Sequence, residues 1–527
     1  MNQDILQFCI EKGVLVDKNI LEIFSEFEDQ EIAKNLIERI NFRYKQKIIN
    51  KSFFNEDYNR VIDLISNYKG IDRKIIESFF NKLGFEIKEN IEYNDVSSEE
   101  VEEDLKFMNL SEIYQNNPKK IEVSDFVKNF KSRFNFLKRV LQDRSELENL
   151  VSINRLENNQ QVFIIALVFD KRITKNGNVL LEIEDLTGKT IALINKNRED
   201  VFEKSKEILL DEVVALKCSS SGEIVFVNDI IFPDAKIFEK KKSKIDESAA
   251  FISDIHIGSN KFLKNNFERF IKWINGEVGS EKQKKEALKI KYLFITGDSI
   301  DGVGVFPGQE NELDIKDVLE QYKLLAIFLS RIREDVEIVI CAGQHDAVRL
   351  AEPQPIIGDN YAEPLYYLKN INFATNPSLV EIGQDVKFKI LMYHGASMHG
   401  VVNSIEALRL GKGHDSPTDI VKYLLKKRHL APTHSLVTYT PFEEDPLLIR
   451  EVPDIIATGD LHRPEVADYN GVLMIASSCW QARTPFEEKV GNNPDPCKVP
   501  VFNLKTREVK ILDFSGGDSD GGEDENS

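Results

Sequence analysis

The stretch AAFISDIHIGSN, residues 249–260, decides the fold class expected for this chain. Its apolar run, residues 249–252, is typical of a buried strand, and Asp254 and His256 follow directly. Two donors placed two residues apart on an extended backbone point to the same side. We therefore expect Asp254 and His256 to share one metal ion.

Four more short clusters of Asp, Gly and His follow strand-like apolar runs. They are TGDSIDG (296–302), AGQHD (342–346), YHG (393–395) and TGDLH (458–462). Loops at the ends of sheet strands carry function in α/β folds, so the clusters are expected to meet. Glycines beside the donors let the backbone approach an ion without a Cβ clash. Five such clusters in order predict a metal site.

Carboxylate and imidazole donors without thiolate suit Mn²⁺, Fe²⁺ or Zn²⁺, and Mn²⁺ fits the large carboxylate share best, with Mg²⁺ as a further alternative. The clusters hold enough donors for two divalent ions. Two ions roughly 3.5–4 Å apart form the arrangement that attacks a phosphorus ester and holds its non-bridging oxygens. The implied reaction is hydrolysis of a phosphate ester.

All eight histidines fall between His256 and His462, which places this chemistry in the C-terminal half. A further group of histidines has no partner donor at strand spacing, and we predict surface or structural roles for its members: His399, His414, His429 and His434.

The segment 247–515 alternates strands and helices and is predicted to be an α/β domain. Before it, residues 151–235 show five short β-type runs with a helix between the third and fourth, which is the order of an OB-fold barrel. OB-folds bind single strands through exposed aromatics. In this chain only a few aromatic residues could stack on bases: Phe163, Phe169 and Phe226. An OB-fold that docks a protein is therefore an equal alternative.

Residues 1–85 have apolar side chains at helical spacing and are predicted to form an all-α domain. Residues 86–150 are read as an acidic linker followed by a mixed helical segment. The mixed helical segment has interleaved aromatic and basic side chains, and we favour helical packing over nucleic-acid contact as their role. Residues 516–527 are expected to be a disordered acidic tail.

Composition excludes several classes of protein. No apolar run approaches the roughly 18 to 20 residues that span a bilayer, and the N-terminus shows no secretory signal, so we expect a cytoplasmic protein without membrane contact. The net charge of −19 disfavours nucleic-acid binding through one broad basic face. Five scattered cysteines, never spaced as CxxC, predict reduced and mostly buried thiols.

The clusters resemble those of the calcineurin-like metallophosphoesterases, whose pattern is DxH, GDxxD, GNHD, a lone His and GHxH. Longer strings resemble the small subunit of the archaeal D-family DNA polymerase, and the similarity spans nearly the whole chain. These strings are DGVGVFPGQ (301–309), HDAVRLAEPQP (345–355), RHLAPTH (428–434), EVPDIIATGDLH (451–462) and SSCWQARTPFEEKVGNNPDPCKVPVF (477–502).

The resemblance implies a helical N-terminal region, an OB-fold, and a metallophosphoesterase domain built as a two-sheet αββα sandwich. It also implies a 3′-to-5′ exonuclease that proofreads at single-stranded DNA 3′ ends for a separate large catalytic polymerase subunit.

By motif, the first ion would be held by Asp254, His256 and His462, and Asp298 would bridge both ions. The second ion would be held by Gln344, His394 and Asp460. His345 would face the scissile phosphate as the catalytic residue, with Asp346 orienting it.

Two positions depart from the family pattern. The chain has Gln344 where the family has Asn, and Asp460 where the family has the first His of GHxH. Both side chains can still ligate, and the change favours oxygen-preferring metals. Two alternatives stay open: a weakened or inactive subunit that acts as a scaffold for the large subunit, and a stand-alone metallophosphoesterase or nuclease.

Overall fold

The structure is a computed structural model in which residues 3–24, 27, 30–44, 47–55, 64, 75–76, 78–80, 82–83, 106–107, 120–222, 224–490 and 492–516 are described. The chain divides into two compact units, Met1–Val101 and Glu102–Ser527. Most of the predicted acidic linker and all but the first residue of the predicted acidic tail lie outside the described residues.

Helices dominate the described part of the N-terminal unit. Its elements are α1 (Gln3–Glu11), β1 (Leu15–Val16), α2 (Lys18–Phe24), α3 (Gln30–Tyr44), β2 (Ile48–Ile49) and α4 (Lys51–Asn55). Phe24 stacks on Phe79 with ring centroids 4.8 Å apart, in the core of the unit. The short parallel pairing of β1 with β2 departs from the all-helical prediction. The predicted apolar stripe is also wrong at Ile10, which is 66% exposed.

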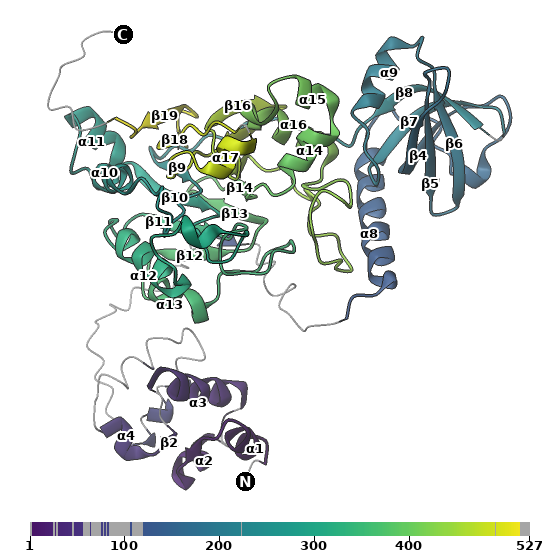
Figure 1. Cartoon of the computed structure of the whole chain (residues 1–527). Helices are drawn as coiled ribbons and strands as arrows, with labels where there is room; N and C mark the ends of the chain where they lie inside the picture. Colours follow the sequence, from purple (N-terminus) through teal and green to yellow (C-terminus); the bar gives the residue numbers. More distant parts are fainter. Residues whose placement is uncertain are drawn as a thin grey trace. The chain divides into compact units, whose positions relative to one another are not determined.

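Two six-stranded sheets form the centre of the second unit (Figure 1). The first sheet has the order β12 (Ile371–Ala374), β11 (Glu337–Cys341), β10 (Ile290–Thr296), β9 (Ser248–Ile252), β18 (Lys498–Asn503) and β19 (Val509–Asp513). The second has the order β16 (Glu465–Tyr469), β17 (Val472–Ala476), β15 (Ile455–Thr458), β14 (Phe388–Met392), β13 (Ser378–Ile382) and β3 (Lys106–Phe107).

One apolar core lies between the sheets, with Phe251 and Phe294 of the first sheet in the same cluster as Ile390 and Ile455 of the second. Helices cover the outer faces. On the first sheet they are α10 (Lys264–Ile274), α11 (Glu281–Ala287), α12 (Val318–Leu329) and α13 (Asp359–Tyr366). On the second they include α14 (Met398–Ser404) and α16 (Pro417–Lys427). The predicted multi-sheet α/β architecture is confirmed.

The central strands explain where the candidate site forms. Strands β9, β10 and β11 are parallel neighbours, and so are β14 and β15. Strands buried on both faces need continuous apolar runs, and β9 and β15 are buried at every position. Parallel strands place their carboxyl ends along one edge, so the loops that carry the five clusters emerge together.

A closed five-stranded barrel precedes the two sheets in the chain. Its elements are β4 (Gln161–Ile173), β5 (Val179–Asp185), β6 (Gly188–Ile194), α9 (Glu199–Lys206), β7 (Val213–Ser220) and β8 (Ile224–Ile231). The five runs and the intervening helix occur in the predicted order. Phe163 is buried, whereas Phe169 and Phe226 are 50% and 43% exposed.

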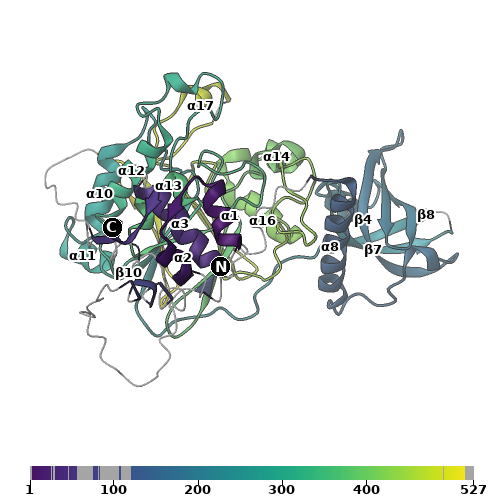
Figure 2. The ribbon, with the colours of Figure 1, turned by 90° about the horizontal axis from the view of Figure 1, so that it is seen from below.

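Helix α8 (Val123–Gln142) packs against the barrel, as Figure 2 shows from a second direction. Phe134, Leu137 and Leu141 are buried on its inner face, in one cluster with Ile165 of β4 and Ala215 of β7. The aromatic residues of this segment therefore serve helical packing, as predicted.

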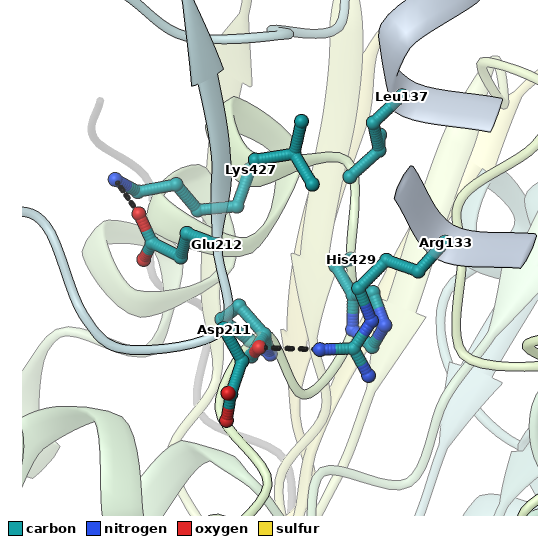
Figure 3. Close-up of a pocket in the computed structure, with 8 residues that line it drawn as sticks. Arg133, Leu137, Asp211, Glu212, Lys427 and His429 are labelled. Carbon is teal, nitrogen blue, oxygen red and sulfur yellow. Dashed lines mark hydrogen bonds and ion pairs between the residues drawn. The ribbon is translucent and has the colours of Figure 1, made fainter. Parts of the chain in front are cut away.

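Buried ion pairs join the barrel and α8 to the two-sheet core, and Figure 3 shows the pair of Lys427 with Glu212. Arg133 of α8 donates from Nε to Asp445 Oδ2 at 2.7 Å, and His429 Nε2 lies 2.9 Å from the same oxygen. Lys427 of α16 donates to Glu212 beside the barrel at 2.8 Å. His429 is thus structural, as predicted. Breaking one partner of such a pair would leave an uncompensated buried charge.

The remaining elements are short: η1 (Ile153–Arg155), η2 (Gln309–Asn311), α15 (Glu406–Leu410), η3 (Gly413–Asp415) and α17 (Pro485–Val490). All five cysteines are free and buried, as predicted. Within the described ranges, none of the helices combines the length and apolar character that crossing a bilayer requires.

We expect Arg133→Met to lower the free energy of unfolding by about 3 to 5 kcal/mol, because Asp445 would lose the guanidinium charge and keep only His429 as a buried side-chain partner. Urea denaturation of the full chain measures this loss. Lys206→Met, which removes an exposed i,i+3 pair with Glu203, is the control and should cost less than about 1 kcal/mol. Equal effects of the two substitutions would contradict a structural role for the buried pair.

The Arg133→Met effect should also depend on pH. Burial raises the pKa of Asp445, but Arg133 and His429 together hold it below its ordinary value. A depressed folded-state pKa gives a stabilisation that is present above the ordinary carboxyl pKa and is lost as pH falls through the folded value. The difference between wild type and variant should therefore shrink in strong acid.

Candidate metal centre

The five clusters meet at the carboxyl ends of β9, β10, β11, β14 and β15. Backbone bonds tie the first two loops together, since Asp254 N donates to Gly297 O and His256 N donates to Asp298 O, both at 3.1 Å. Asp460 N donates to Asp254 Oδ2 at 3.0 Å and attaches the fifth loop to the first. The structure thus brings together all eight residues predicted for the site.

The donors reach this edge through a backbone conformation that the sequence did not predict. A positive φ occurs at five of the seven predicted ligands: Asp254, His256, Asp298, Asp460 and His462. The expectation of an extended backbone was therefore wrong. These five residues adopt the left-handed backbone region, which is uncommon for residues other than glycine and costs roughly 1–3 kcal/mol per residue. This conformation turns the loops back sharply, so that each donor points to the centre.

Close approach explains two of the glycines. A Cβ at Gly343 would lie 2.2 Å from Asp298 Oδ1, and a Cβ at Gly459 would lie 2.7 Å from Asp254 Oδ2 and 1.9 Å from the Ser253 hydroxyl. Only a residue without a side chain fits at these points. At both positions the glycine makes room for a donor carboxylate, whereas the sequence prediction concerned the approach of the backbone to an ion.

The first group of donors is Asp254, His256 and His462. His462 Nε2 lies 3.3 Å from His256 Nε2 and 3.3 Å from Asp254 Oδ1. His256 Nε2 lies 3.9 Å from the same carboxylate oxygen. All three side chains are at most about one-tenth exposed, so these atoms face one another away from solvent.

The other ring nitrogens show which atoms are free to ligate. His462 Nδ1 lies 2.8 Å from Glu487 Oε1, and His256 Nδ1 lies 2.9 Å from Asp301 Oδ1. Glu487 accepts from His462 Nδ1 and leaves Nε2 of that ring directed at Asp254 and His256, whereas His256 Nδ1 touches Asp301 but makes no hydrogen bond with the described residues. Two imidazole nitrogens and a carboxylate oxygen that converge on one point form a donor set for a divalent cation.

The second group contains Asp298, His394, Gln344 and Asp460. His394 Nε2 lies 3.2 Å from Asp298 Oδ2 and 3.9 Å from Asp460 Oδ1, while its Nδ1 lies 2.8 Å from Thr296 O. Gln344 Nε2 donates to Asp460 Oδ1 at 3.3 Å. Three buried atoms of this group have no hydrogen-bond partner among the described residues: His394 Nε2, Gln344 Oε1 and Asp460 Oδ2. The group therefore also fits a cation.

Electrostatics keep the shared carboxylate charged. Burial alone would raise the pKa of Asp298, but the imidazoles of His394 and His345 hold it well below its usual range. Burial lowers the pKa of His394, and the carboxylates of Asp298, Asp254 and Asp460 more than offset this, so it lies well above its ordinary value. Asp298 lies within ligand distance both of His256 and His345 and of Asp254 and His394, which places it between the two groups.

His345 stands at the edge of the centre. Its Nδ1 lies 2.8 Å from the carbonyl oxygen of Asp301, so Nδ1 donates and Nε2 is the atom left for a substrate. Burial lowers its pKa, but Asp298 and the Asp301 contact raise it above the ordinary value.

The expected role of Asp346 is wrong. Its Oδ2 accepts from the backbone of Gly343 and Ser299 at 3.0 and 3.3 Å, and its Oδ1 accepts from Tyr322 Oη at 3.1 Å. Asp346 therefore holds two loop backbones together and does not orient the imidazole of His345. Burial and the nearby Asp298 raise its pKa to about 6.

Sequence reasoning missed several side chains around the donors. Asp301 and Glu487 fix the two imidazoles of the first group, although Asp301 lies in the GDxxD motif and Glu487 in a string typical of the family. The sequence predicts no partner donor for His399, yet its Nε2 lies 3.4 Å from Asp460 Oδ2. These contacts join residues far apart in sequence, so no local spacing could have revealed them.

Comparisons with known proteins identify the family of this chain. The family model for the B-type subunits of DNA polymerases alpha and epsilon matches residues 249–467. The DNA polymerase II small subunit of Methanothermobacter thermautotrophicus is 40% identical over 396 residues, which cover 75% of this chain and 80% of that protein. The DNA polymerase II small subunit of Pyrococcus furiosus is 39% identical over 405 residues, covering 75% of this chain and 64% of the relative.

The chain belongs to the family of archaeal DNA polymerase II small subunits. Among solved structures, an archaeal phosphodiesterase aligns over 50% of this chain and 98% of its own length, with 12% identity and a TM-score of 0.24, a similarity too low to define the fold.

We expect Glu487→Gln to weaken metal binding by about 10- to 100-fold, because His462 would lose the carboxylate that fixes its tautomer and raises its basicity. Titration calorimetry with Mn²⁺ measures the change. The neighbouring exposed residue offers a matched control, Glu488→Gln, which should bind Mn²⁺ as the wild type does. An unchanged affinity in Glu487→Gln would show that the carboxylate does not support the ligand.

Proposed function

We propose that this chain is the small subunit of a replicative DNA polymerase and that it carries a metal-dependent 3′-to-5′ exonuclease, which proofreads for a large catalytic subunit. One observation supports the nuclease above all others: imidazole lone pairs and carboxylates converge on two adjacent points in a buried edge. Family membership supports the polymerase role and the large-subunit partner. The 3′ direction follows from the sequence resemblance.

Two divalent cations are assigned to the centre. Asp254, His256 and His462 would hold the first, and Gln344, His394 and Asp460 would hold the second, with Asp298 between them. The high share of oxygen donors favours Mn²⁺, with Mg²⁺, Fe²⁺ or Zn²⁺ as alternatives. Bound divalent cations supply the Lewis acidity that polarises a phosphodiester and activates the attacking water.

The chain's own residues do the remaining work. Asp301 and Glu487 fix the ring orientation of His256 and His462. His345 keeps Nε2 directed outward because its Nδ1 is engaged by the Asp301 carbonyl. Asp298 and the Asp301 carbonyl raise the pKa of His345, which favours the protonated ring, so His345 can stabilise the charge on the scissile phosphate or give a proton to the 3′-oxygen leaving group.

We also propose that residues 151–235 are an OB-fold and that residues 1–85 and 247–515 are separate domains. The closed barrel with a helix between its third and fourth strands supports the first assignment. The buried ion pairs that join the barrel to the two sheets favour a rigid platform for a protein partner over an independently moving DNA-binding module.

A scaffold without catalysis is the second candidate, and the departures at Gln344 and Asp460 favour it. Exonuclease assays separate the two functions. With Mn²⁺ and a 3′-labelled single strand, wild type should release nucleotides, and Asp298→Ala should lose the activity by at least about 10³-fold, because it removes the carboxylate shared by both groups. Asp200→Ala, an exposed position on α9, is the control. An inactive wild type would leave only the scaffold.

We expect Asp460→His to keep activity but to shift its metal preference toward Zn²⁺, because a neutral nitrogen donor replaces a charged oxygen. The ratio of rates with Zn²⁺ and Mn²⁺ measures the shift. The same exchange at an exposed strand position, Asp468→His, should leave the ratio unchanged. Loss of hydrolysis with every metal would contradict a ligand position that accepts either donor.

A further inference from the structure

A polar cavity of about 210 Å³ lies beside the second group of donors. It is formed by the segment that follows α15 together with one residue of a second loop. Its side-chain lining consists of Arg409, Lys412, His414, Asp415 and Asn492. Nothing in the proposed cleavage chemistry uses these residues.

Two histidines connect the cavity with the metal centre. His414 Nε2 lies 3.1 Å from His399 Nδ1, and the other nitrogen of that ring, His399 Nε2, lies 3.4 Å from Asp460 Oδ2. A single imidazole ring therefore separates the cavity wall from a predicted metal ligand. The cavity therefore lies next to the second group of donors in the structure.

The cavity is cationic in a chain whose net charge is −19. Its one carboxylate, Asp415, is already engaged by Arg463, whose Nη1 lies 3.3 Å away. Arg409 donates from Nη1 to the carbonyl of Asn403 at 2.9 Å and keeps its positive charge. Lys412 forms no ion pair with any acidic side chain in the described segments. The side chains that line the cavity therefore carry a net positive charge.

We propose that this cavity binds a backbone phosphate of the DNA strand, beside the metal centre that would cleave it. The inference rests on DNA being the substrate of the proposed function and adds a site that positions the strand. Phosphate contacts from Arg and Lys fix the register of a nucleic acid without reading its sequence. His399 would link the two sites, because it contacts Asp460 on one side and the cavity wall on the other.

The test measures DNA binding without hydrolysis. The full chain, kept in EDTA, is titrated against fluorescent oligo-dT and a mixed-sequence single strand at several salt concentrations. The double variant Arg409→Gln/Lys412→Gln should weaken binding to both strands equally and should reduce the slope of log K against log[salt] by about 1. Thermal unfolding of each variant verifies that the fold is kept.

The double variant Lys282→Gln/Lys285→Gln on α11 removes the same charge at exposed positions and is the matched control. An affinity and salt slope equal to wild type in the Arg409→Gln/Lys412→Gln variant would overturn the proposal, as would a wild type that binds neither strand. Binding of the mononucleotide dTMP is measured alongside. If the Arg409→Gln/Lys412→Gln variant binds dTMP more weakly but oligo-dT as the wild type does, the proposal is also overturned. A wild type that binds DNA through the cavity but releases no nucleotides with Mn²⁺ would refute the exonuclease and leave this site standing.

Discussion

The convergence of buried imidazoles and carboxylates at the carboxyl ends of five strands is the constraint on which the rest of the structure depends. Two imidazole nitrogens and a carboxylate oxygen face one another within 3.3–3.9 Å in the first group, and carboxylates surround His394 in the second. Buried carboxylates are costly unless positive charge compensates them. Left-handed backbone at five of the donors adds further cost, and strain of this kind persists only where surrounding structure enforces it. The parallel strands, the two tightly fitted glycines and the contacts of Asp301, Glu487 and Asp346 supply that enforcement.

Rigidity extends beyond the site. The barrel and α8 are joined to the two sheets by buried ion pairs and shared apolar packing, so the second unit presents several surfaces fixed relative to one another. A subunit that docks a large partner and also holds a DNA end benefits from such an arrangement, because catalytic geometry needs support from well-packed elements. The same rigidity serves a scaffold equally well. The donors at the strand ends, and not the architecture, therefore distinguish an enzyme from a scaffold.

The sequence alone predicted the elements that a clear pattern of neighbouring residues reveals. It missed strands with a weak pattern and contacts between distant segments. Apolar runs identified β9, β10, β11, β14 and β15, and the Asp, Gly and His clusters after them identified all eight residues that the structure brings together. The strands β12, β13, β16, β18 and β19, at or next to the sheet edges, escaped because partly exposed or irregular runs carry little periodicity. Spacing also suggested extended backbone at Asp254 and His256, where turns with positive φ occur. The roles of Glu487, His399 and Asp346 depend on contacts between distant segments, which no pattern along the chain records.

Counting bound ions by anomalous scattering at the manganese edge, in crystals of the full chain grown with Mn²⁺, tests the central claim most directly. The account predicts two peaks, one among Asp254, His256 and His462 and one among Gln344, His394 and Asp460, with Asp298 in contact with both. The absence of any peak at these strand ends would contradict the assignment of the convergent donors as ligands. A single peak in the first group would contradict a two-ion centre and favour the scaffold.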